Sequence, residues 1–270
     1  MDKSTIVGIF FALGGIVAGL LMEGGKIAQI LQPTAAMIVF GGTLGAVLVQ
    51  FPLPIVLEAC KRLGHVFLDR GEDPAALVEE LVKYAQRARI SGIVSLDSDV
   101  QKISDPFLKK TLMLAVDGTE PRELRRIIEP ELDNHAERAE KIAQVFESAG
   151  GFAPTIGIIG AVLGLIQVME HLGNIDEVGR GIAVAFVATI YGVGSANLLF
   201  LPSAGKLKIK SRAEQLQREM TLDGVISILE GMNPRMLEAK LFGYLLEKGQ
   251  EQRPRRAGAS ESPVLSGRRA

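Results

Sequence analysis

Apolar residues gather in four stretches of this chain, and charged segments separate them. A helix needs about 20 mostly apolar residues to cross the hydrocarbon core of a bilayer. Four stretches meet this length without a single Asp, Glu, Lys or Arg: about Ser4 to Met22, Thr34 to Leu57, Phe152 to Met169 and Gly181 to Ala204. The pattern therefore predicts an all-α integral membrane protein with four transmembrane helices. The first stretch is too long for the core of a signal peptide, so we expect a retained helix.

The four stretches divide the chain into five predicted parts. Residues 1–57 hold the first two spans, and 58–147 form a polar, helical loop. The third and fourth spans fill 148–204, a helical tail follows over 205–248, and a disordered C-terminus over 249–270, which is rich in Arg, Ser, Gly and Pro. The loop and the tail are expected to build one helical cytoplasmic domain.

Helix-start signals occur within the loop. Asp73 and Pro74 have the residue types of an N-cap followed by a first helical position, and Asp105 and Pro106 repeat them. After Pro74 the pattern places four side chains on one face, Leu77, Leu81, Tyr84 and Ala88. A third helix is expected from Pro130 into the third span. No β-strand pattern of any length occurs in the sequence.

Lys and Arg decide the expected orientation in the membrane. Segment 58–147 holds 14 of them and the tail 13, while the short connections 23–33 and 170–180 carry only Lys26 and Arg180. We therefore expect the loop and both termini on the cytoplasmic side.

The rest of the composition excludes several classes of protein. The formal net charge of -1 argues against nucleic-acid binding. Cys60 has no second cysteine to pair with, and the three histidines do not cluster, so neither a disulfide framework nor a metal site is expected. No phosphate-binding loop or other catalytic motif occurs. We predict that the protein is not an enzyme and needs no cofactor.

Polar residues inside the last two spans indicate a different activity. A single Thr in a membrane helix usually donates its hydroxyl to its own backbone, but several polar side chains in neighbouring helices favour a polar path. The set consists of Thr155, Thr189, Tyr191, Ser195 and Asn197. Small residues, such as those of the GxxxG pair Gly160 and Gly164, would let helices of this chain or of neighbouring copies approach closely.

This path lacks a titratable group. Intramembrane proton relays use Asp, Glu or His, and none of these lies in any of the four stretches. If the protein conducts ions, a helix of a partner must supply the titrating side chain. Two prolines, Pro154 and Pro202, lie near the cytoplasmic ends of the last two spans; we interpret Pro154 as a first-turn proline and Pro202 as a site that invites a kink, and both as possible hinges.

The chain resembles the MotA/PomA family, the ion-channel subunits of the bacterial flagellar stator. The resemblance covers about residues 1–248 and includes four spans with a large loop between the second and third. It rests on the motifs GGFAPTIGIIGAVLGLI, AVAFVATIYGVGSANLLFLPSAGKL, GMNPRMLEAKL and RISGIVSLDSD.

The resemblance implies partners and residue roles. Family members form a ring, thought to be pentameric, around a MotB dimer that supplies the ion-binding aspartate, in the bacterial inner membrane. They contact the rotor protein FliG. The carried-over roles are ion pathway for Thr189, coupling for Pro154 and Pro202, and rotor contact for Arg89, Asp97 and Glu131. Asp97 is one methylene shorter than the usual Glu of the family.

The third span bears on the ion. Sodium-driven family members tend to carry Thr where this chain has Ala161. Sodium needs several oxygen ligands, whereas a proton needs a carboxylate and a nearby water or hydroxyl, which Thr189 and Thr155 could supply. We therefore expect protons, although Ala161 could simply pack against a helix.

Two other functions remain open. An energiser of the ExbB/TolQ type would serve an envelope complex instead of a flagellum. Such relatives have three spans, so the fourth apolar stretch of this chain argues against this function. A passive membrane scaffold would conduct no ion, and removal of the hydroxyls at Thr155 or Thr189 would then have no effect.

Overall fold

The structure, a computed structural model, describes residues 3–67 and 73–251, and these are helical with short connections. No strand occurs within these two ranges. The chain forms two compact units. The first comprises residues 1–72 and 122–219, and the second 73–121 and 220–270, each as far as it is described. The all-α prediction is confirmed, whereas most of the predicted disordered C-terminus lies outside the described residues.

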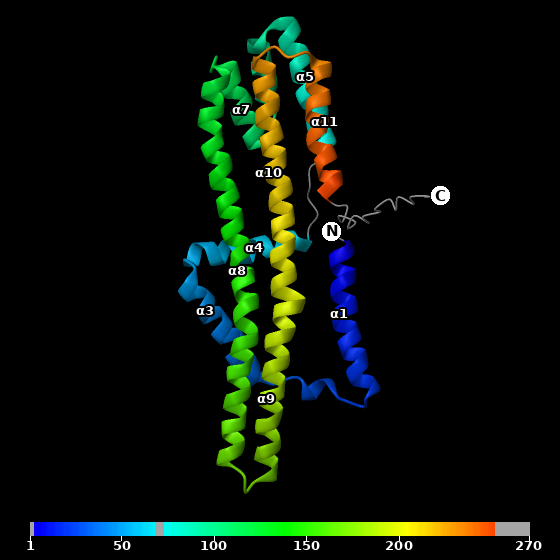
Figure 1. Ribbon diagram of the computed structural model, residues 1–270, viewed down its shortest axis with the longest axis vertical. Coiled ribbons are helices and arrows are strands. Elements are labelled where there is room, and N and C mark those ends of the chain that lie inside the picture. Colours follow the sequence, from blue (N-terminus) through cyan, green and yellow to red (C-terminus); the bar gives the residue numbers. More distant parts are fainter. Residues whose placement is uncertain (1–2, 68–72, 252–270) are drawn as a thin grey trace, which may run out of the picture. The chain divides into compact units, whose positions relative to one another are not determined.

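The first unit is dominated by a long antiparallel hairpin (Figure 1). Helix α8 (Pro121–Glu170) descends, and α9 (Ile175–Ser195) returns beside it and leads into α10 (Leu201–Leu229). Asn174 begins α9, because its side-chain oxygen accepts a hydrogen bond of 3.2 Å from the backbone N–H of Asp176. The hairpin thus brings the third and fourth apolar stretches together.

The N-terminal elements of this unit precede the hairpin in the chain, and those from Pro33 onward pack against it. They are α1 (Lys3–Met22), η1 (Ile27–Gln29), α2 (Pro33–Ala36), the π-helical turn η2 (Met37–Gly41), α3 (Gly42–Gln50) and α4 (Leu53–Phe67). Ala35 and Val39 pack on Val187 and Ala188 of α9. The stretch expected as one span to Leu57 instead breaks at Phe51, and α4 then runs across α8 (Figure 1). Pro52 accounts for the break, because the residue before a proline avoids helical backbone angles.

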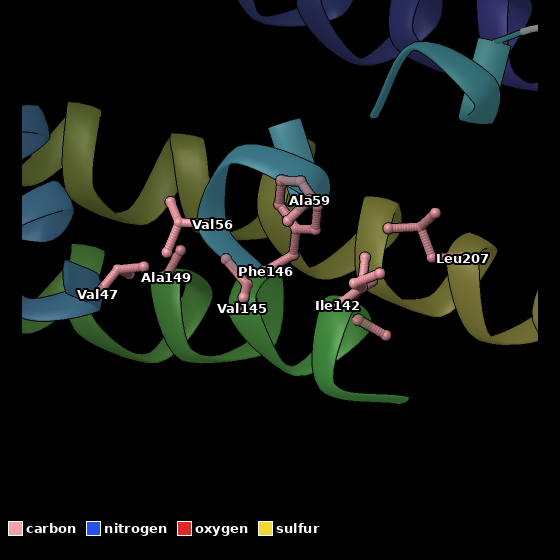
Figure 2. Packing of buried hydrophobic residues seen from close by; sticks show 10 residues of the cluster. Val47, Val56, Ala59, Ile142, Val145, Phe146, Ala149 and Leu207 are labelled. Carbon is pink, nitrogen blue, oxygen red and sulfur yellow. The ribbon is translucent and has the colours of Figure 1, made fainter. Parts of the chain in front are cut away.

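Apolar side chains anchor α4 to the hairpin (Figure 2). Val56 and Ala59 point from α4 toward α8, where Ile142, Phe146 and Ala149 face them. Leu207 of α10 closes the cluster. These residues are at most 6% exposed, so the cluster fixes the turn that follows the second span.

The second unit is a small helical bundle. It contains α5 (Pro74–Ser91), η3 (Ile93–Leu96), α6 (Asp97–Val100), α7 (Pro106–Val116), the end of α10 and α11 (Pro234–Glu251). Both predicted N-caps are confirmed: the carboxylates of Asp73 and Asp105 accept hydrogen bonds of 3.0 and 2.9 Å from the N–H groups of Ala75 and Phe107. Helices α5 and α11 lie side by side (Figure 1).

The buried face of α5 differs from the predicted one. Val78, Leu81 and Ala85 are buried, while Leu77, Tyr84 and Ala88 are only partly covered. Packing on α10 decides the face: a Cβ on Gly224 would stand 2.8 Å from Leu81 Cδ1. The motif GMNPRMLEAKL, which begins at Gly231, contains the start of α11. The Asn233 side chain caps this helix, because it accepts a hydrogen bond of 3.0 Å from the Arg235 N–H.

Three helices are long and apolar enough to cross a membrane within the described residues. They lie in Pro33–Gln50, Pro121–Glu170 and Ile175–Leu229, and a shorter apolar helix covers Val7–Met22. Large apolar side chains, among them Phe10, Phe11, Ile158 and Phe186, are more than half exposed on these helices. Such surfaces are expected where lipid or another subunit covers the protein.

Candidate functional site

Small residues let α8 and α9 approach until their backbones touch. A Cβ on Gly157 would lie 2.9 Å from the carbonyl oxygen of Ala188, and one on Gly164 would lie 2.8 Å from that of Gly181. On α9, a Cβ on Gly192 would lie 2.5 Å from the carbonyl oxygen of Ala153. We call this contact the glycine seam. It shows that these glycines join helices within one chain.

The helices α2 and α3 cover one side of the glycine seam. A Cβ on Gly160 would lie 3.3 Å from Ile38, and one on Gly42 would lie 2.8 Å from Ile156. With about 100° of rotation per residue, Ile156 and Ala161 lie on opposite sides of the seam. Ala161 is therefore on the side that α2 and α3 leave open.

Three of the predicted residues share this open side, which we call the pore face. Pro154 precedes Ala161 by seven residues, or about two turns, and so lies on the same stripe of α8. On the antiparallel α9, Thr189 flanks the seam on the same side, next to Ala188 and away from the Val187 that contacts α2. Pro154, Ala161 and Thr189 are all partly buried. The structure thus places on one side of the seam three residues that the sequence assigned to two different spans.

Thr155 lies elsewhere. It is exposed and, two residues from the buried Ala153, lies on the face of α8 opposite the glycine seam. Its hydroxyl donates a hydrogen bond of 2.8 Å to the carbonyl of Phe152. The Thr189 hydroxyl likewise donates to the carbonyl of Ala185, at 3.2 Å. Because each proton is engaged by the helix, each oxygen still has lone pairs for an ion or a water.

The other polar side chains of the fourth stretch have structural bonds. Tyr191 donates a hydrogen bond of 2.6 Å to the Ile30 carbonyl and accepts one of 3.3 Å from the Gln32 N–H. It thereby ties the connection before α2 to α9. Ser195 and Asn197 donate to carbonyls of their own helix. No pattern in the sequence separates the structural Tyr191 from Thr189.

The two prolines have different local structures. Pro154 lies inside α8, so its interpretation as a first-turn residue is wrong. The helix continues through Pro154, although the proline has no N–H to donate to the carbonyl of Gly150. Pro202 is the second residue of α10, which follows a π-helical turn, η4 (Ala196–Phe200). Since Pro202 has no N–H, the regular bonding is interrupted here, as expected of a site that invites a kink.

Arg89 and Asp97 flank a turn in the second unit. Arg89 lies in the last turn of α5 and Asp97 begins α6. Both are exposed, and neither forms an ion pair with any residue of the described ranges. Their neighbours Arg87 and Asp99 do pair, which links α5 to α6.

Glu131 lies in the first unit, on α8, and is partly buried. It is close to a group of charged residues that joins α8 to α4 and α10. Arg138 donates two hydrogen bonds, of 2.8 and 2.6 Å, to one carboxylate oxygen of Glu58, and these bonds lower the pKa of Glu58. The Lys208 ammonium lies 3.0 Å from carboxylate oxygens of Glu140 and Glu147, and the hydrogen bonds that it donates to both raise its pKa.

His135 belongs to the same group. Burial lowers its pKa below 6.5, the repulsion from Arg218 and Arg62 adds to this, and Glu214 and Glu131 oppose it. Folding therefore favours the neutral imidazole.

Comparison with known proteins identifies the family. Residues 6–89 match the motility protein A N-terminal family, and residues 99–220 match the MotA/TolQ/ExbB proton channel family. Motility protein A of Bacillus subtilis is 36% identical over 252 residues, which are 92% of each chain. Chemotaxis protein PomA of Vibrio alginolyticus is 30% identical, over 92% of this chain and 96% of that protein.

A solved structure agrees with these relatives. The structure of C. jejuni MotAB matches with a TM-score of 0.85 and 32% identity, and it covers 90% of this chain and 96% of that one. Both units contribute to this coverage, since neither alone reaches it. The chain therefore belongs to the MotA/PomA family of channel-forming subunits of the flagellar motor stator.

Proposed function

We propose that this subunit carries protons through a path that its own residues only half complete. Its pore face offers the Thr189 oxygen, and the four apolar stretches contain no carboxylate, histidine or other charged side chain. A single-span partner of the MotB type supplies the aspartate that binds the ion, as the match to a MotAB complex supports. The missing titratable group is the observation that carries the proposal.

The proposed assembly is a ring of copies in the membrane. Four helices cross the inner membrane, with both termini in the cytoplasm, where Lys and Arg concentrate. Five copies surround two partner helices, each with its pore face inward. Exposed apolar side chains on α1 and on the α8–α9 hairpin are then covered by lipid or by a neighbouring copy.

The proposed output is torque on the rotor protein FliG. Arg89 and Asp97 contact the rotor from the second unit, and Glu131 from the first. Pro154 and Pro202 lie where a change at the pore face would be passed to the cytoplasmic helices. An envelope energiser of the ExbB/TolQ type has less support, because the relatives that match almost the whole chain include motility protein A and chemotaxis protein PomA.

A flux assay tests this function. The chain is co-expressed with its MotB-type partner, and cytoplasmic acidification is recorded after an acid pulse outside. We expect acidification that disappears when the partner's aspartate is changed to asparagine. Equal acidification with and without that carboxylate would contradict the proposal.

A further inference from the structure

Two apolar side chains between Arg89 and Asp97 in the sequence are exposed to solvent. Ile90 is 86% exposed and Val94 is 69% exposed. Their apolar neighbours in the same segment behave differently, because Leu96 and Val100 are buried at 0% and 1% exposure. Ile90 and Val94 therefore do not belong to the core of the second unit, although Leu96 and Val100 nearby do.

The segment that carries them has a fixed shape. The Gly92 N–H donates a hydrogen bond of 2.8 Å to the Ala88 carbonyl and ends α5, and Gly92 adopts a φ of 80° that favours glycine. Both the N–H and the hydroxyl of Ser95 donate to the Gly92 carbonyl, at 3.1 and 2.7 Å. The Arg87–Asp99 ion pair joins the two ends of the segment. Ile90 and Val94 are thus held in place before any partner arrives.

Exposed apolar residues on a rigid surface, framed by charge, are typical of the centre of a protein–protein contact. Exposed ion pairs contribute little to affinity, while apolar side chains that lose contact with water contribute more. Arg89 and Asp97, of opposite sign and without partners in the described chain, would fix the orientation of the contact. The two apolar side chains between them would supply most of its strength.

We infer that Ile90 and Val94 form the apolar centre of the rotor contact, and that Arg89 and Asp97 form its charged rim. The partner that fits is a helix with an acidic residue opposite Arg89, a basic residue opposite Asp97 and an aliphatic side chain between them. This inference rests on the proposed rotor contact and adds to it the source of the binding strength.

The experiment measures binding of purified FliG to the complete stator complex in lipid nanodiscs at about 50 mM and about 500 mM salt. Interactions between exposed charges are much more strongly screened at the higher concentration. We expect Ile90→Ser and Val94→Ser each to weaken binding about tenfold at both salt concentrations, as loss of one buried aliphatic side chain does. Arg89→Ala should weaken it at low salt only. Ile90→Leu should bind like the wild type, which shows that the apolar character matters.

Met236→Ser is the matched control, because Met236 is 64% exposed on α11 of the same unit. It should bind like the wild type, and an equal loss in this variant would overturn the inference. So would wild-type binding by Ile90→Ser and Val94→Ser while Arg89→Ala binds weakly, a result that leaves the proposed function intact. If the wild-type complex binds no FliG at either salt concentration, the rotor contact itself is wrong.

A photo-reactive side chain at position 90 should form an adduct with FliG in cells. An adduct with a second copy of this chain alone would equally overturn the inference.

Discussion

Gly192 of α9 lies so close to Ala153 of α8 that a Cβ on the glycine would stand 2.5 Å from the alanine's carbonyl oxygen. The clashing atom belongs to the backbone and cannot rotate away, so the helices themselves would have to separate. The glycine seam therefore sets the distance between the two helices that carry the pore face.

Gly192→Ala should destabilise the hairpin by about 1 to 3 kcal/mol, the usual cost of overpacking a filled site. Melting of the detergent-solubilised stator complex, followed by loss of its oligomer, measures this. The matched control is Gly194→Ala in the same helix, where a Cβ would meet nothing within 4 Å. Equal melting temperatures for the two variants would mean that the seam is looser than the structure shows.

The pore face predicts unequal roles for the two threonines. Thr189→Val should strongly reduce motility, since it removes the hydroxyl of the pore face, whereas Thr155→Val should have a smaller effect because Thr155 lies on the opposite face of α8. Valine keeps the size and β-branching of threonine, so both variants should reach the membrane. Swimming speed at equal membrane levels measures the effect, and a larger loss in Thr155→Val would contradict the assignment of the pore face.

The prolines predict a loss of coupling without a loss of protein. Alanine at position 154 or 202 restores a backbone N–H and removes a ring that costs about 3 kcal/mol in a regular helix. Pro154→Ala and Pro202→Ala should therefore stay in the membrane at wild-type levels and still lower motility. Quantitative immunoblots of membranes and tethered-cell rotation test this. Loss of the protein from the membrane would mean that these prolines only shape the fold.

His135 predicts a pH dependence of stability. Its folded-state pKa is lowered below 6.5 because burial disfavours the charged ring. As pH falls through 6.5, the unfolded chain takes up a proton before the folded protein does, so the wild type loses stability. His135→Gln should lose less between pH 7.5 and pH 5.5. Melting temperatures of the complex across this range measure the difference, and parallel curves would show that His135 titrates normally.

The apolar pattern predicted the helical class and the location of the long hairpin, because long charge-free stretches have few alternatives to helix in a membrane. It did not predict that the stretch ending at Leu57 breaks at Phe51, since apolar residues continue into α4 and only Pro52 and Pro54 mark the change. It also placed Pro154 at a helix start, where proline is common, although the structure continues the helix through it.

The candidate site was less predictable than the fold. The resemblance of the motifs selected Thr189, Ala161 and Pro154. Only the structure shows that these three lie on the side of the glycine seam that α2 and α3 leave open, and that Thr155 does not. Helical spacing alone does not show which side a neighbouring helix covers. The exposure of Ile90 and Val94 was equally hidden, because aliphatic residues in a short turn are usually assigned to a core.

The nature of the ion is the last prediction. Thr189 contributes one oxygen to the pore face, and Ala161 contributes none. Sodium must replace its water ligands with several oxygens, whereas a proton needs the partner's carboxylate and one nearby oxygen or water. Swimming speed should therefore persist in sodium-free, potassium-matched buffer and fall to zero with a protonophore. Ala161→Thr, which adds one oxygen per subunit beside Thr189, provides the matched variant for the same measurements. Swimming that stops without sodium and survives the protonophore would show that the wild-type path selects sodium, and that oxygens of the partner complete its site.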